Sequence, residues 1–310
     1  MTRWGLVATI RAPAREILEF AGYHIEQGAH RLYIYLDEPS ADAEAALNAH
    51  PKIRVTVCDD AYWRKLGRNR PGKHQLRQTA NATHAYTRKA EVDWLIHIDV
   101  DEFLWPDTRV GDHLEALPDS ALCARVRPME ALAGTDGYFK AFIPSGPDRD
   151  RIVERLYPTF GPYVKGGFLS HVAGKLFVRT GLGAVTIKIH NAFRGDDMNP
   201  GQVELSDVAL CHCHATSWDQ WFAAYRYRLL KGSYRAELAP SRPRDKGGLS
   251  MHELLSMIEA EDGEAGIRAF HDELCADTPR LREALSREGL LRHCDLQLSH
   301  VLAAQFPDCT

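Results

Sequence analysis

One stretch decides how this sequence folds: Asp93-Trp94-Leu95-Ile96-His97-Ile98-Asp99-Val100-Asp101-Glu102-Phe103-Leu104. Its apolar run is typical of a buried strand, and three acids follow within four residues. Side chains alternate along a strand, so we expect Asp99 and Asp101 on one face, with Cα atoms about 7 Å apart. Such buried charges need a partner. The stretch therefore predicts a cation site, and the competing interpretation is a surface turn in which Glu102 caps a neighbouring group.

The cation that suits this motif is Mg²⁺ or Mn²⁺. These ions favour octahedral oxygen coordination, are held by only one or two carboxylates, and fill their other positions with water and phosphate oxygens. A nucleoside diphosphate fits that open coordination sphere.

Strand and helix patterns alternate ahead of the motif. Strand patterns cover residues 4–10, 31–36 and 53–57, and helical patterns cover residues 14–25, 42–49 and about 74–89. This order predicts an α/β fold with a mostly parallel, Rossmann-like central sheet flanked by helices. Ligands of such sheets gather at the carboxyl ends of the strands, so Arg11, Asp37 and Asp99 would share one edge.

The pattern loosens after residue 106. Short strand candidates at 121–126, 175–179 and 185–189 lie between Gly- and Pro-rich loops, and capping boxes at Ser217 and Ser250 open two helices. This half is expected to be more antiparallel and rich in loops.

The bulk composition limits the function classes. The chain has 310 residues, 45% of them hydrophobic, and a formal charge of −4 without a basic block, so nucleic acid is not an expected partner. It has no apolar run long enough to span a membrane and no recognisable signal peptide. Seven scattered cysteines fit reduced thiols. We expect a cytoplasmic protein, and peripheral membrane association remains compatible with the sequence.

Three segments together carry a family resemblance: Ala8-Thr9-Ile10-Arg11, Tyr35-Leu36-Asp37 and the stretch at 93–104. They resemble family 2-like glycosyltransferases of the GT-A fold, in the subgroup whose motif reads Asp-x-Asp-Glu-Phe. The resemblance implies a metal-dependent, inverting hexosyltransferase-type enzyme. Its donor would be a nucleotide-sugar, with UDP-sugar expected, and its acceptor a saccharide or another hydroxyl compound. The resemblance also implies a role in polysaccharide biosynthesis.

The resemblance also implies a domain plan. Residues 1–105 would form the nucleotide-sugar-binding half of a GT-A domain, and residues 106–235 its acceptor-binding half. Residues 236–310 would form a helical carboxyl-terminal segment.

Site residues are implied position by position. Thr9, Arg11 and Asp37 would line the nucleotide pocket, Asp99 and Asp101 would hold the metal and diphosphate, and Gln78 is a further candidate for contact with the base or sugar. The family tends to add a downstream histidine to the metal site. The candidates, among which the sequence does not choose, are His190, His212 and His214.

Inversion requires a carboxylate that deprotonates the acceptor hydroxyl while the metal stabilises the departing diphosphate. The candidates by position for this catalytic base are Glu130 and Asp136, and Asp196 or Asp197 stay open as others.

Several alternatives compete with this interpretation. A metal-dependent nucleotidyl- or phosphotransferase can use the same paired aspartates. A glycoside hydrolase needs two carboxylates that flank the substrate and no nucleotide pocket. A non-catalytic scaffold on a degenerate transferase fold would lose its affinity for metal or donor. Structural zinc at residues 211–214 is disfavoured, because the cysteines and histidines of a strand there would face opposite ways.

Overall fold

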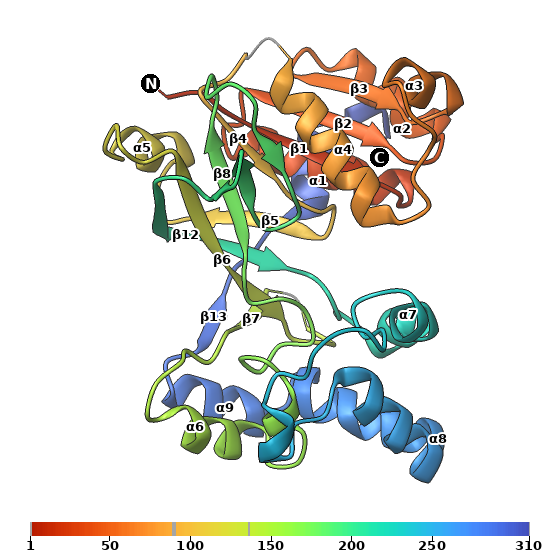
Figure 1. Cartoon of the computed structure of the whole chain (residues 1–310), viewed down its shortest axis with the longest axis vertical. Coiled ribbons are helices and arrows are strands. Elements are labelled where there is room, and N and C mark those ends of the chain that lie inside the picture. The colour runs from red at the N-terminus through yellow and green to blue at the C-terminus, as the bar shows by residue number, and fades with distance from the viewer. Residues whose placement is uncertain (1, 89–90, 136, 310) are drawn as a thin grey trace. The chain divides into compact units, whose positions relative to one another are not determined.

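The computed structural model describes residues 2–88, 91–135 and 137–309 of the chain, which forms two compact units (Figure 1). The first unit comprises the described parts of residues 1–127, 173–210 and 296–310. The second comprises those of 128–172 and 211–295.

Four parallel strands form the start of the first unit. They are β1 (Trp4–Ile10), β2 (Arg31–Leu36), β3 (Ile53–Val57) and β4 (Trp94–His97), in the spatial order β4-β1-β2-β3. The helices between them are α1 (Ala14–Glu26), α2 (Ala41–Ala49), α3 (Asp60–Lys65) and α4 (His74–Thr87). The predicted alternation of strands and helices is confirmed, and it brings the carboxyl ends of these strands to one edge.

Antiparallel pairs extend the sheet beyond β4. β8 (Lys175–Arg179) lies antiparallel to β4, and β6 (Cys123–Ala131) lies antiparallel to β8. β12 (Gln202–His212) pairs with both β6 and β5 (Glu102–Pro106). The α/β class is confirmed, but the expectation of a mostly parallel sheet is wrong, because the strands that follow β4 return along the sheet without the long helical crossovers that parallel neighbours require.

Short elements complete the first unit. α5 (Val110–Glu115) follows β5, and a separate small sheet contains β9 (Thr186–Ile187), β10 (Ala192–Arg194) and β11 (Asp197–Met198).

Helices dominate the second unit. They are α6 (Arg149–Leu156), α7 (Trp218–Leu230), α8 (Met251–Cys275) and α9 (Pro279–Arg287), and beside them β7 (Tyr138–Ala141) pairs antiparallel with β6 and with β13 (Leu291–His293). The predicted capping box at Ser250 is confirmed, since its side chain and that of Glu253 exchange hydrogen bonds with each other's backbone N–H. Gly263, at φ 60°, interrupts α8. The expectation of a helical carboxyl-terminal region is confirmed.

The last helix belongs to the first unit. α10 (Leu298–Gln305) packs so closely on α1 that a Cβ added to Gly22 would lie 3.2 Å from the carbonyl oxygen of Val301. Gln305 also donates a 2.7 Å hydrogen bond to Glu26. The compact units group residues by contact in space, and the domain plan with boundaries at residues 105 and 235 stays a prediction.

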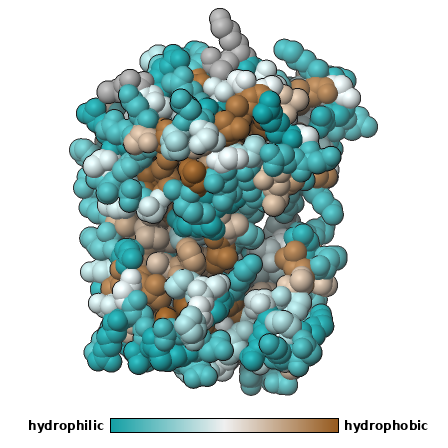
Figure 2. All heavy atoms as spheres, turned by 60° about the vertical axis from the view of Figure 1, so that its left-hand side comes forward, coloured by the Kyte–Doolittle hydropathy of each residue, from teal (hydrophilic) through white to brown (hydrophobic). Residues whose placement is uncertain are grey.

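None of the described helices combines the length and apolar character that a membrane span needs. Hydrophilic residues cover most of the face shown in Figure 2, with smaller apolar groups among them.

Candidate functional site

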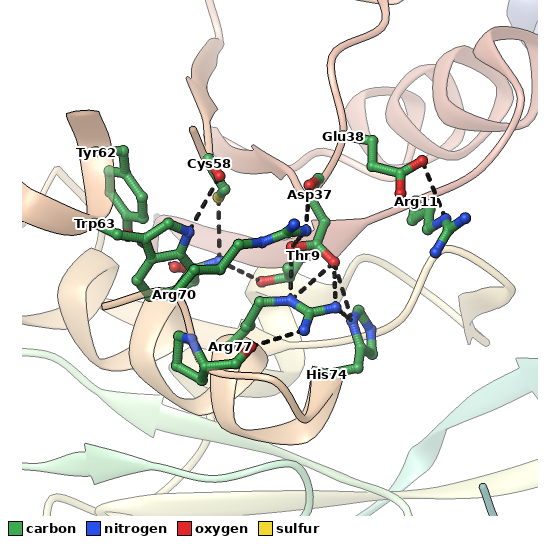
Figure 3. Close-up of polar contacts among 12 residues, drawn as sticks. Thr9, Arg11, Asp37, Glu38, Cys58, Tyr62, Trp63, Arg70, His74 and Arg77 are labelled. Carbon is green, nitrogen blue, oxygen red and sulfur yellow. Dashed lines mark hydrogen bonds and ion pairs between the residues drawn. The ribbon is translucent and has the colours of Figure 1, made fainter. Parts of the chain in front are cut away.

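The candidate site of the first unit lies where β1 and β2 end. The backbone N–H of Asp37 donates a 2.8 Å hydrogen bond to the carbonyl oxygen of Ile10, so Asp37 and Thr9 are held beside each other at this edge. Two polar networks start from these residues (Figure 3).

The first network surrounds the Asp37 carboxylate, whose side chain is fully buried. Arg77 donates to both carboxylate oxygens over 2.7–3.0 Å, Arg70 donates over 3.1 Å, and His74 forms an ion pair at 3.4 Å. Burial alone would raise the pKa of Asp37, but the hydrogen bonds from His74, Arg77 and Arg70 outweigh it and hold that pKa well below its ordinary value. Asp37 is therefore an ionised anchor for two guanidinium groups.

Arg77 extends this anchor to the loop before α4. Its Nη1 donates to the carbonyl oxygens of Pro71 and Gly72 over 2.9 and 3.0 Å. Because the shown contacts of the Asp37 carboxylate are all to basic side chains, its predicted contact with a base or ribose stays a prediction.

The second network fixes Thr9. Asn81 is fully buried; its Nδ2 donates to the Thr9 hydroxyl over 3.0 Å and to the Cys58 sulfur over 3.4 Å. Tyr62 in turn donates a 2.7 Å hydrogen bond to Asn81 Oδ1. The Thr9 hydroxyl is thus oriented by α4.

Arg11, the third residue predicted for the nucleotide pocket, has a different environment. Its side chain is 67% exposed and pairs with Glu38 at 3.1 Å. Figure 3 shows this pair to one side of the contacts around Asp37.

The acidic motif lies in a turn. β4 ends at His97 and β5 begins at Glu102, so Asp99 and Asp101 do not alternate along one strand, and that part of the prediction is wrong. Glu102 accepts a 2.8 Å hydrogen bond from the backbone N–H of Asp99, and its own N–H donates to the Asp99 carbonyl over 3.1 Å. The competing interpretation, a turn capped by Glu102, describes the backbone, although Glu102 itself is buried.

The cation beside two of these acids is a lysine. Lys175 Nζ lies 2.7 Å from Asp99 and 3.1 Å from Glu102, and its side chain is fully buried. Burial would lower the pKa of Lys175, yet the charges of Asp99 and Glu102 raise it above its ordinary value, so it stays an ammonium. Gln78, predicted to contact the base or sugar, donates a hydrogen bond to Asp99.

Sequence reasoning placed residues 175–179 on a strand but did not pair Lys175 with the acidic motif. A signal exists in the strand pairing: Ile96 faces Phe177 in the antiparallel β4 and β8 pair, so continuing the register puts Lys175 opposite Ile98, next to Asp99.

The negative charges of Asp101 and Glu16 interact. Burial, and then the charges of Glu19 and Asp101, raise the pKa of Glu16 in the first turn of α1. A carboxylate beside a further carboxylate is a setting that favours a bound cation.

The three candidate histidines divide between the units. His190 belongs to the first unit, where its Nδ1 lies 2.9 Å from the Gly174 carbonyl oxygen. His212 ends β12 and His214 follows in the second unit, with their ring centroids 5.1 Å apart. The choice among them as a metal ligand stays open.

Glu130, a predicted catalytic base, is fully buried in the second unit. It forms a 3.2 Å ion pair with Lys140 and accepts hydrogen bonds from the backbone N–H groups of Leu169 and Ser170 over 3.0 and 2.8 Å. Burial would raise the pKa of Glu130, but the charges of Lys140 and His214 and these hydrogen bonds lower it to about 2. A buried carboxylate that is held by an ion pair and two hydrogen bonds is better suited to a structural role than to proton abstraction.

The other predicted bases give less information. Asp136 lies outside the described residues. Asp196 and Asp197 are both exposed; Asp197 begins β11 and Asp196 precedes it.

The chain was compared with protein families, curated sequences and solved structures. Neither a protein-family model nor a curated protein sequence matches this chain. Among solved structures, the chain is similar to HddC from Yersinia pseudotuberculosis at 11% identity and a TM-score of 0.38, covering 73% of this chain and 99% of that one. It is also similar to a mycobacterial protein at 12% identity and a TM-score of 0.31, covering 57% of this chain and 53% of the other. Similarities at these TM-scores carry no argument about function, which therefore depends on the site residues.

Proposed function

We propose that this chain is a metal-dependent glycosyltransferase that uses a nucleoside diphosphate sugar, with UDP-sugar as the expected donor and a saccharide hydroxyl as the expected acceptor. The observation that carries the proposal is the grouping of Thr9, Asp37 and the turn at Asp99 and Asp101 where neighbouring parallel strands of the first unit end. Ligands of α/β sheets bind at this edge.

In this proposal Asp101 is the metal ligand and Asp99 is a positioning residue. Lys175 and Gln78 engage the Asp99 carboxylate, and Glu102 fixes the backbone of the turn. The carboxylate of Asp101 offers the hard oxygen that Mg²⁺ or Mn²⁺ prefers, and the acidic environment it shares with Glu16 supports a cation there. When bound, the metal would neutralise charge on the departing diphosphate.

Asp37 has an indirect part in the proposal. Through Arg70 and Arg77 it ties residues 70–72 to the end of β2, and so shapes one wall of the proposed nucleotide site. Thr9, oriented by Asn81, would supply a hydroxyl to the ligand.

The test is a calorimetric titration of UDP with and without Mn²⁺ into the wild type, Asp101→Asn and the control Asp42→Asn, an exposed acid of α2. We expect binding that requires Mn²⁺, that Asp101→Asn weakens at least tenfold, and that the control leaves unchanged. Folded protein that binds no nucleoside diphosphate would contradict the proposal and favour the non-catalytic scaffold.

A second assay separates the competing enzyme classes. Release of UDP from a UDP-sugar that depends on an added saccharide supports the transferase. Release of pyrophosphate from a nucleoside triphosphate and a sugar phosphate would instead show a nucleotidyltransferase.

A further inference from the structure

The first unit contains a pocket whose lining includes neither Thr9 nor Asp37. Its volume is about 530 Å³, within the range of small-molecule sites. Residues of β3, α3 and α4, with Arg88 just beyond α4, line it, and those that matter here are Arg54, Thr56, Tyr62, Lys65, His84 and Arg88.

The two sites lie toward opposite ends of α4. His74 and Arg77, in the first turn, contact Asp37, whereas His84, in the last turn, lines the pocket. His84 is ten positions after His74, which is about 15 Å along a helix.

Strand pairing places the lining residues Arg54 and Thr56 on one face of the sheet. Tyr35 faces Thr56 across β2 and β3, and Tyr33 faces Arg54, so these four side chains share one face of the sheet. The Tyr35 hydroxyl lies 2.8 Å from His84 Nδ1 and fixes the imidazole ring.

The lining is cationic. Arg54, Lys65 and Arg88 contribute three positive charges, and none of the described lining residues is acidic. Arg54 forms an ion pair with Glu91 at 3.4 Å, and Glu91 also forms one with Arg31 at 3.0 Å. The charges of Lys65 and Arg88 therefore remain without an acidic partner among the residues that the structure describes.

The positive charges of the lining also affect the pKa of His84. Burial, and then the positive charges of Arg88 and Lys65, lower the pKa of His84. An anion in the pocket would oppose that field and favour the protonated ring, which would then donate a hydrogen bond to the anion.

We propose that this pocket binds a small phosphate-bearing metabolite through Lys65, Arg88 and His84. Lysine and arginine side chains recognise phosphate by charge-assisted hydrogen bonds. Tyr62 also lines the pocket, and an aromatic side chain can offer apolar surface to the rest of such a molecule. The inference does not rest on the proposed function.

The test is a calorimetric titration of pyrophosphate in EDTA, so that no metal-dependent site contributes. The variants are Lys65→Ala with Arg88→Ala, and the control Arg64→Ala, which removes an exposed charge from α3 without touching the pocket lining. We expect saturable binding by the wild type and the control, and at least tenfold weaker binding by the double variant. Both replaced side chains are exposed, so the double variant should keep its fold, which its circular dichroism and melting temperature would verify.

Sulfate, whose charge is constant between pH 6 and 8, tests His84. Binding should be tighter at pH 6 than at pH 8, and His84→Ala should remove this difference. No saturable binding at millimolar pyrophosphate, or equal affinity in the double variant, would refute the proposal.

Discussion

Replacing Lys175 with methionine should destabilise the first unit strongly, because it leaves two carboxylates without the cation that neutralises them. The ammonium lies 2.7 Å from Asp99 and 3.1 Å from Glu102 and is fully buried. Removing one partner of such a group costs about 3–5 kcal/mol. For a unit of about 180 residues, where 1 kcal/mol shifts the melting temperature by about 2–4 °C, this predicts a decrease of roughly 6–20 °C.

The raised pKa of Lys175 determines the sign of the pH dependence. A lysine whose folded-state pKa lies above its unfolded value contributes fully below the unfolded value, about 10.4, and loses its contribution as the pH rises through the folded value. The whole effect is therefore present at pH 7, where urea unfolding followed by circular dichroism measures it.

Two further variants sharpen this measurement. Lys188→Met, at an exposed lysine of the same unit, should change the free energy of unfolding by less than about 1 kcal/mol. Glu102→Gln should cost less in the Lys175→Met background than in the wild type, because it removes one of the unpaired charges. A loss below about 1 kcal/mol in Lys175→Met, or strict additivity of the two changes, would refute the buried-charge argument.

Two other ion pairs give predictions of the same kind. Asp37→Asn should lower the stability of the first unit at pH 7; since the folded-state pKa of Asp37 is depressed, the loss should shrink as the pH falls below about 4, as unfolding curves at several pH values would reveal. Glu130→Gln should lower the stability of the second unit by about 3–5 kcal/mol, measured by urea unfolding, because Lys140 loses its buried partner. A fully stable Glu130→Gln variant with abolished sugar transfer would instead restore Glu130 as the catalytic base.

Local patterns predicted the first part of the fold well. The strands at 4–10, 31–36 and 53–57 agree with β1, β2 and β3 because each is a short apolar or alternating run between clear turn signals. The same patterns could not indicate strand direction after residue 106, since that depends on which distant strand each one pairs with.

The candidate site was predictable in composition but not in geometry. Thr9, Asp37, Gln78 and Asp99 do lie in polar networks at strand ends or on α4. The partner of Asp99 is 76 residues away in sequence, and no local pattern connects a lysine on one strand to an acid after another. The turn that separates Asp99 from Asp101 was considered only as the competing interpretation, because an apolar run followed by Glu102, Phe103 and Leu104 has the composition of one long strand.

The packing of α10 on α1 has a consequence for biosynthesis. The face of α1 around Gly22 is synthesised before its cover, since the buried residues Val301 and Leu302 are made about 280 residues later. At about 5–20 residues per second this interval lasts roughly 15–55 s, during which an apolar surface of the nascent chain lacks its native cover. Newly made chains should therefore depend on chaperones that shield this face until translation has passed α10.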